Sequence, residues 1–132
     1  MGSTIRAVSR GAVSFEIRDG RAVWDGQTLT EWVTPLVDGL VEEFDPVEVV
    51  LFGSVARGED DGDSDLDILV MLDVYEPQTA IALKKRAVRT ARAPVPFDVC
   101  FTDPNRFAAR ARIAGTIERA ASAEGHVVYR RG

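Results

Sequence analysis

Asp65 and Asp67 are separated by a single residue at the start of an apolar run, residues 68–71. Alternate residues of a β-strand project from one face, so these two carboxylates should lie side by side, roughly 6–7 Å apart at the backbone. Two such carboxylates repel each other and are costly to desolvate unless a cation lies between them. Their oxygen atoms suit Mg²⁺, which takes one or two carboxylates and completes its shell with water and phosphate oxygens.

A glycine–serine pair, Gly53 and Ser54, follows a second apolar run at residues 49–52. Both runs are short and rich in β-branched and large apolar residues, which predicts two buried strands. Gly53 would let the backbone approach a ligand, while free N–H groups and the Ser54 hydroxyl could hold phosphate oxygens. A phosphate-binding turn that faces a carboxylate pair predicts chemistry on a nucleotide.

The pattern Gly-Ser, ten residues, Asp-x-Asp resembles the signature of the DNA polymerase β-like nucleotidyltransferases. The compact form of the chain resembles the minimal nucleotidyltransferases, many of which are antitoxins paired with HEPN-domain toxins. The resemblance extends from about Thr30 to about Tyr129. It implies an α/β (α+β) fold, in which a mixed β-sheet is flanked by helices.

The resemblance also implies a third acidic residue on a later strand, beside the Asp-x-Asp pair. Asp98 is the candidate, because it lies in an alternating apolar segment, residues 97–101. The alternative is an edge-strand aspartate that faces water. On the family pattern, Asp65, Asp67 and Asp98 would be the catalytic residues and would ligate two Mg²⁺ ions.

The remaining site residues would bind the nucleotide, with ATP or another NTP as substrate. Gly53 and Ser54 would hold the β- and γ-phosphates, and Arg57 would add charge there unless it is a solvated loop arginine. The implied reaction is transfer of AMP, or another NMP, to a hydroxyl. The main hypothesis is an antitoxin that modifies a tyrosine of a partner HEPN toxin, within a hetero-oligomer. The alternatives are a non-catalytic antitoxin that acts by contact and a stand-alone enzyme that modifies small molecules such as antibiotics.

The composition limits the class of protein. A chain of 132 residues with 45% apolar content is one domain of ordinary size, and its net charge of −5 argues against binding along nucleic-acid backbones. The single cysteine, Cys100, cannot form an internal disulfide, which suits a reducing compartment. No apolar run approaches the ~20 residues of a membrane span, and no signal-peptide core is present. We therefore expect a cytoplasmic protein that does not interact with membranes.

Residues 1–29 are expected to form an N-terminal hairpin extension, ahead of a nucleotidyltransferase domain at 30–132. Asp19-Gly20 predicts a two-residue turn in a hairpin over residues 8–26. That turn sets the opposed pairs Phe15–Trp24, Ile17–Ala22 and Arg18–Arg21. The hairpin could extend a sheet over the core, which we favour, or offer an edge to a partner.

Three helices are predicted from periodicity and capping residues. The first follows a capping box of Thr28 and Glu31 and ends at Asp45-Pro46, although Pro35 would move its start towards Thr34 if it must lie in the first turn. The second spans residues 79–93, and the third runs from Asp103 to about residue 124. A closing strand is expected at 127–129.

Several residues within and beside these elements have alternative interpretations. The second helix should bury Ala80, Leu83, Ala87, Val88 and Ala91, and the third should bury Phe107, Ala111, Ala114, Ile117 and Ala121. The basic residues Lys84, Lys85, Arg86, Arg89 and Arg92 indicate a solvated face or, alternatively, a docking surface for an acidic partner or RNA. In the loop, Asp60, Asp61 and Asp63 are interpreted as solvated turn residues, Ser64 as a turn former and His126 as a helix-end residue.

Overall fold

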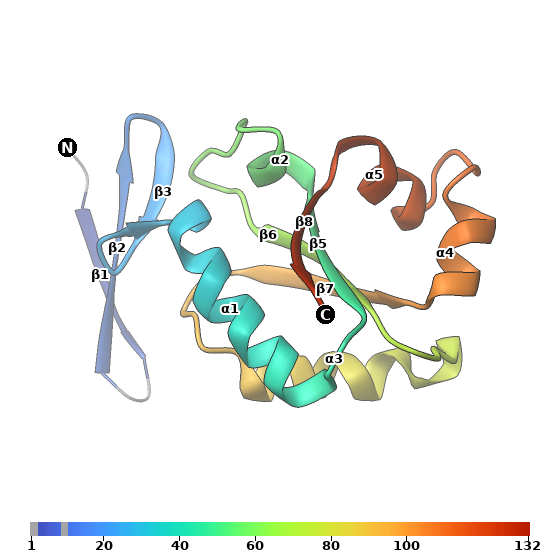
Figure 1. The fold of residues 1–132 in the computed structure, drawn as a ribbon. Helices are drawn as coiled ribbons and strands as arrows, with labels where there is room; N and C mark the ends of the chain where they lie inside the picture. The colour runs from blue at the N-terminus through green and yellow to red at the C-terminus, as the bar shows by residue number, and fades with distance from the viewer. Residues whose placement is uncertain (1–2, 9–10) are drawn as a thin grey trace.

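The computed structural model describes residues 3–8 and 11–132, which form two separate sheets (Figure 1). The main sheet has the order β7-β6-β5-β8, in which β6 and β7 are parallel and β5 is antiparallel to both β6 and β8. Its strands are β5 (Glu48–Phe52), β6 (Leu66–Met71), β7 (Phe97–Thr102) and β8 (His126–Arg130). Every strand predicted for the core is present, and the mixed sheet with flanking helices confirms the expected fold class.

Helices cover both faces of the main sheet. They are α1 (Leu29–Phe44), α2 (Gly53–Ala56), the 3-10 turn η1 (Pro77–Thr79), α3 (Ala80–Thr90), α4 (Pro104–Arg110) and α5 (Ile117–Glu124). Helices α1 and α3 pack on one face, where Ile68, Val70 and Val99 are buried. Helices α4 and α5 cover part of the other face, around Leu69 and Ala121. None of the helices in the described part of the chain has the length and apolar character needed to span a membrane.

Helix α1 begins with the predicted capping box. The Thr28 hydroxyl accepts a hydrogen bond from the Glu31 N–H at 3.3 Å, and the Glu31 carboxylate accepts one from the Thr28 N–H at 2.9 Å. The helix starts at Leu29 and continues through Pro35, so the expected slip of its start towards Thr34 does not occur. The cap satisfies the first backbone donors and thereby fixes the start.

Helix α3 is shorter than predicted, and its buried stripe is narrower. Ala87 is fully buried and Leu83 packs against the core, but Val88, which was expected to face inward, is 65% exposed. Each residue of a helix turns by about 100°, so the residue after a buried alanine faces away from the sheet. The basic face is partly paired within the chain, through the ion pairs Lys84–Asp98, Arg86–Glu43 and Arg92–Glu42.

The single helix predicted from Asp103 to residue 124 is wrong, because the chain forms two helices there. Helix α4 ends at Arg110, and Thr116 caps α5 by accepting a hydrogen bond from the Arg119 N–H at 3.1 Å. Gly115 has φ of +86°, a backbone conformation that glycine adopts without strain. Ala114 lies exposed in the turn and Ile117 is 39% exposed, so neither is the core residue that was expected.

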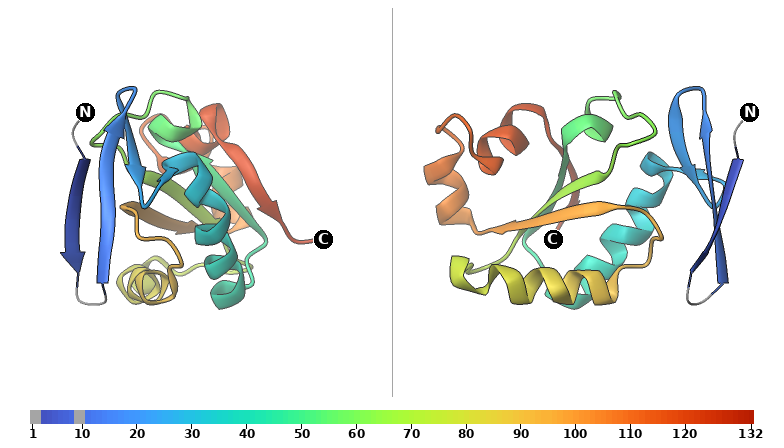
Figure 2. Two further views of the ribbon diagram at one scale, coloured as in Figure 1. Left: turned by 90° about the vertical axis from the view of Figure 1, so that its left-hand side faces the viewer. Right: turned by 180° about the vertical axis from the view of Figure 1, so that it is seen from behind.

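The N-terminal residues form their own antiparallel sheet of β1 (Ser3–Val8), β2 (Gly11–Arg18), β3 (Arg21–Trp24) and β4 (Gln27–Thr28), in that order. The predicted register is confirmed for the pairs Phe15–Trp24, Ile17–Ala22 and Arg18–Arg21. Residues 9 and 10 of the predicted hairpin lie outside the described residues. Figure 2 shows this sheet at one end of the molecule, beside the start of α1.

Candidate active site

The three candidate carboxylates lie on one face of the main sheet. Asp67 of β6 and Asp98 of β7 are partners in the parallel register, so their side chains leave the sheet in the same direction. Asp65 directly precedes β6 and shares that face by alternation. Asp67 is partly buried, whereas the Asp98 side chain is 57% exposed at the edge strand. The strand register therefore places Asp67 and Asp98 side by side, while Asp65 lies just outside the paired residues.

Gly53 lies directly against the carboxylate of Asp67. Phe52, the last residue of β5, pairs with Asp67, and the chain then turns at Gly53 with φ of +81°. A Cβ atom at position 53 would lie 2.1 Å from Asp67 Oδ2, so no larger residue fits without displacing the carboxylate. Position 53 must therefore be glycine because the Asp67 carboxylate lies against it, and Asp67 belongs to the carboxylate pair that this turn was predicted to face.

Ser54 is linked to the far end of the loop through Ser64. The Ser54 Oγ lies 3.2 Å from the Ser64 Oγ, which accepts a hydrogen bond from the Asp61 N–H at 2.8 Å. Asp61 in turn accepts the Asp63 N–H at 2.9 Å. These contacts give Ser64 the predicted turn-forming role and close the loop between β5 and β6.

Asp60 is not the solvated turn residue that was expected. Its side chain is 1% exposed and forms a 3.0 Å ion pair with Arg21 of β3. Nearby, Ile17 packs so closely over Gly62 that a Cβ there would lie 2.6 Å from the isoleucine Cδ1. A buried carboxylate needs a partner, and Arg21 of the N-terminal sheet is that partner for Asp60. The N-terminal sheet therefore covers part of the loop between β5 and β6.

The negative charges around the Asp67 carboxylate outweigh the positive charge near it. Burial raises its pKa to about 6, and the charges of Asp65 and Asp98 add to the increase. Arg57 acts in the opposite direction but does not offset these effects. A carboxyl group with a raised pKa among like charges marks a place where a bound cation would be stabilised.

Arg57 is held by two acidic residues. It donates to Glu59 at 2.8 Å and to both carboxylate oxygens of Glu124 at 3.0 and 3.1 Å, and these hydrogen bonds raise its pKa. Glu124 also contributes to the raised pKa of Asp67, so it lies close enough to influence the site. No sequence signal points to Glu124, because it reaches the motif only when α5 folds back over α2.

Asp98 lies near a lysine and a cysteine. Lys84 Nζ of α3 is 3.7 Å from Asp98 Oδ1. Burial, with a further contribution from the charge of Asp98, raises the pKa of the Cys100 thiol two residues along β7. The thiol is therefore protonated at neutral pH.

His126 begins β8 instead of ending a helix. Its Nε2 lies 2.9 Å from the Ala56 carbonyl oxygen, to which it must donate a proton. The ring thus ties β8 to the end of α2, which is a structural role.

Divalent-metal binding fits the donor chemistry of these residues. Asp65, Asp67 and Asp98 offer hard oxygen ligands on one face, and the charge around Asp67 favours a cation. Within residues 3–8 and 11–132, no three acidic, histidine or cysteine side chains converge into a ready metal cage. Mg²⁺ needs only one or two carboxylates alongside water and substrate phosphates, so Asp65 and Asp67 would be sufficient.

Two comparisons with known proteins found matches to this chain. A family model described as "Nucleotidyltransferase domain" matches residues 35–122, which include every candidate site residue. A crystal structure from Sulfolobus solfataricus, provisionally described as a nucleotidyltransferase, matches with a TM-score of 0.56 and 20% identity, over 78% of this chain and 81% of that chain. At that identity the likeness shows a shared fold alone. No curated protein matches the chain significantly.

Proposed function

The chain belongs to the nucleotidyltransferase domain family, and on that basis we propose that it transfers a nucleoside monophosphate from an NTP, with ATP as the main candidate, to a hydroxyl group. The observation that carries this proposal is the joint placement of Gly53 and three aspartates. Asp65, Asp67 and Asp98 share one face of the sheet, and the Asp67 carboxylate lies against the Gly53 backbone.

Each residue has a separate role in the proposed reaction. Gly53 and Ser54 orient the β- and γ-phosphates, while Asp65 and Asp67 hold Mg²⁺. Divalent ions held there would offset the negative charge of the phosphates and of the attacking oxygen as it loses its proton. The hydroxyl oxygen forms a bond to the α-phosphorus as the bond to pyrophosphate breaks. Asp98 is the exposed carboxylate at the edge of the site and accepts the hydroxyl proton.

The acceptor that we propose is a tyrosine of a HEPN-family toxin, for which this protein would be the antitoxin. The resemblance of the motif to minimal nucleotidyltransferases supports this assignment. The open position of Asp98 at the edge strand β7 is also consistent with it, because a partner protein could approach there.

The direct test is incubation of the protein with Mg²⁺, labelled ATP and a candidate HEPN toxin, followed by intact-mass analysis. We expect one or more AMP additions on a toxin tyrosine with the native protein and none with Asp67→Asn. Equal AMP addition by Asp65→Ala would reject the assigned site. If Asp67→Asn neutralises the toxin fully without any modification, the protein acts by contact. Transfer to an antibiotic or sugar without a partner would replace the toxin assignment.

A further inference from the structure

A cavity of about 200 Å³ lies at the β7 edge of the main sheet, between the start of α3 and the pair α4–α5. Its polar lining consists of Tyr75, Lys84, Cys100, Arg106, Arg110 and Glu118. None of the arginines or the glutamate belongs to the nucleotidyltransferase motif. The cavity therefore needs an explanation of its own.

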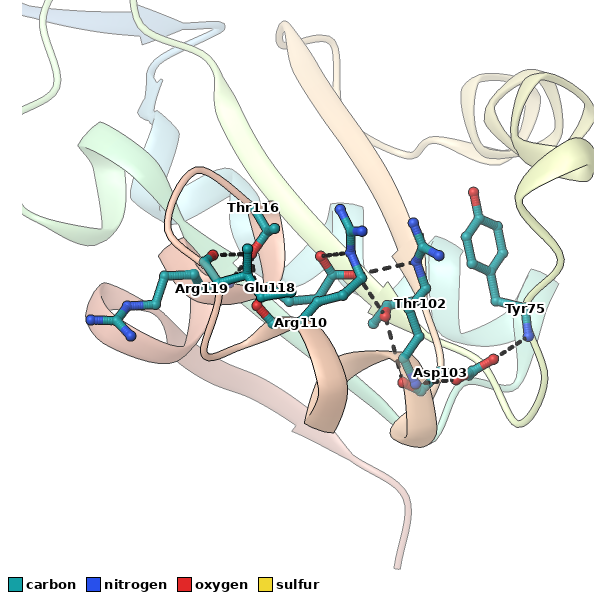
Figure 3. A network of polar contacts seen from close by, with 9 residues as sticks. Tyr75, Thr102, Asp103, Arg110, Thr116, Glu118 and Arg119 are labelled. Carbon is teal, nitrogen blue, oxygen red and sulfur yellow. Dashed lines mark hydrogen bonds and ion pairs between the residues drawn. The ribbon is translucent and has the colours of Figure 1, made fainter.

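Glu118 of α5 anchors the cavity wall. Its side chain is 4% exposed and accepts hydrogen bonds from Thr102 Oγ1 at 3.0 Å and from Arg110 Nε at 3.1 Å (Figure 3). Arg106 Nε forms a longer ion pair with the same carboxylate, at 3.4 Å. Burial raises the pKa of Glu118, but its own backbone N–H, Arg110 and Thr102 donate to the carboxylate and keep the pKa below its ordinary value. The glutamate is therefore ionised at neutral pH.

The lining of the cavity carries excess positive charge, because Lys84, Arg106 and Arg110 lie there with a single carboxylate, Glu118. The Asp103 carboxylate lies near Arg106 but outside the lining. Both arginines use their Nε atoms towards Glu118, and in the described part of the chain their terminal Nη atoms have no hydrogen-bond partner. Arg106 also lies over the Tyr75 ring, with its guanidinium carbon 5.7 Å from the ring centroid. Two neighbouring guanidinium groups with free Nη atoms form a fork that suits a carboxylate or phosphate.

The cavity lies beside the candidate active site, on its β7 side. Lys84 lines the cavity and lies 3.7 Å from Asp98, and Cys100 follows Asp98 by two residues on the same strand face. Gly53 and Ser54 lie on the opposite, β5 side of Asp67. A molecule in the cavity would therefore approach the carboxylates from the side away from the Gly-Ser turn.

We propose that this cavity binds an anionic group of the acceptor, a carboxylate or phosphate that lies near the hydroxyl to be modified. The role in the acceptor rests on the proposed function. A volume of about 200 Å³ holds one such group with a few waters of ~30 Å³ each, and is smaller than the ~300–1,000 Å³ of typical ligand pockets. The protein would then prefer acceptors that have an acidic or phosphorylated group close to the hydroxyl that is modified.

The first test uses inorganic phosphate and acetate as separate probes, without nucleotide or metal. NMR follows the backbone amide signals of the residues that line the cavity in every variant, and the arginine Nε–H signals in the native protein. We expect saturable shifts for Arg106 and Arg110, with binding at least tenfold weaker in the variant R106Q/R110Q. The matched control is Arg112→Gln, which removes an exposed arginine outside the cavity and should bind as the native protein does. Stronger binding of phosphate than of acetate would indicate a phosphorylated acceptor, and the reverse an acidic one.

The glutamine variant could unfold because it leaves Glu118 without its cations. The variant R106K/R110K keeps both charges but removes the fork, so it should fold and bind phosphate several-fold more weakly. Unchanged binding in this variant, or no saturable shift in the native protein, would overturn the proposal.

A second test separates this inference from the proposed function. At constant free Mg²⁺, inorganic phosphate should inhibit transfer in competition with the acceptor and not with ATP. Competition with ATP would overturn the acceptor role. If no acceptor is modified at all, the proposed function fails, while the phosphate titration still decides whether the cavity is an anion site.

Discussion

Two carboxylates lie over the same face of the main sheet in opposite electrostatic conditions. Glu118 is almost fully buried, yet two arginines and a threonine surround it, and its pKa lies below the ordinary value. Asp67 is less buried but is bordered by Asp65 and Asp98, and its pKa is raised to about 6. The degree of burial alone would have ranked the two groups the other way round.

The difference separates a carboxylate that is paired within the fold from one whose acidic neighbours leave its charge uncompensated. The partners of Glu118 come from β7 and α4, so its contacts join α5 to the rest of the fold. The neighbours of Asp67 leave it with uncompensated charge, which folding tolerates where a ligand later supplies the cation. Variants of the two regions should therefore have opposite effects on stability and activity.

The largest stability change is expected from Glu118→Gln. Loss of a buried charge that pairs with Arg106 and Arg110 should lower the free energy of unfolding by about 2–3 kcal/mol, less than for a fully buried pair because the arginines reach water. Urea denaturation measures this change. The control Glu59→Gln removes an exposed partner of Arg57 and should cost about 0.5 kcal/mol. Equal effects of the two variants would contradict the structural role of Glu118.

A smaller change is expected from Gly53→Ala, with Gly58→Ala as its matched control. Both glycines have positive φ, +81° and +71°, so alanine should cost each about 1–2 kcal/mol in backbone strain. Only at position 53 would the new Cβ also collide with Asp67, whereas at position 58 it meets nothing within 4 Å. Nucleotide transfer should therefore be lost in Gly53→Ala and retained in Gly58→Ala. Similar transfer rates in both variants would show that the Asp67 contact is unimportant.

The smallest effect is expected in the pH dependence of the metal-free protein. The pKa of Asp67 is about 6 in the folded chain and about 3.9 in an unfolded one, so the folded state binds the proton more tightly. The contribution of Asp67 to stability is thus complete below pH 4 and is lost as the pH rises through 6. Because water screens this partly exposed group, we expect a loss of about 1 kcal/mol.

The comparison for this measurement is Asp67→Asn, followed by thermal unfolding between pH 4 and pH 8. In the variant, stability should no longer change with pH through the titration of Asp67. At pH 8 the variant should be as stable as the native protein or more so. Mg²⁺ should stabilise the native protein more at pH 8 than at pH 5, because the metal competes with the proton. A variant that is less stable than the native protein at pH 8 would contradict the account of Asp67.

The sequence by itself determined the elements whose signals are local. The apolar runs around the Gly-Ser and Asp-x-Asp residues became β5 and β6, and alternation correctly placed Asp98 on the face of its strand opposite Val99. The Asp19-Gly20 turn fixed the hairpin register, and the capping box fixed the start of α1. These features depend on residues within a few positions of each other, so periodicity and turn chemistry are sufficient to predict them.

The tertiary structure alone decided which distant residues meet. In one continuous helix, Arg110 and Glu118 would lie about 12 Å apart along the axis, and only the break between α4 and α5 brings them into contact. The Gly115-Thr116 pair was a local signal for this break, but nothing local indicated the partner of Asp60 on β3 or the reach of Glu124 to Arg57. Such ion pairs form because folding buries charges from separate elements together, and no short stretch of sequence encodes that proximity.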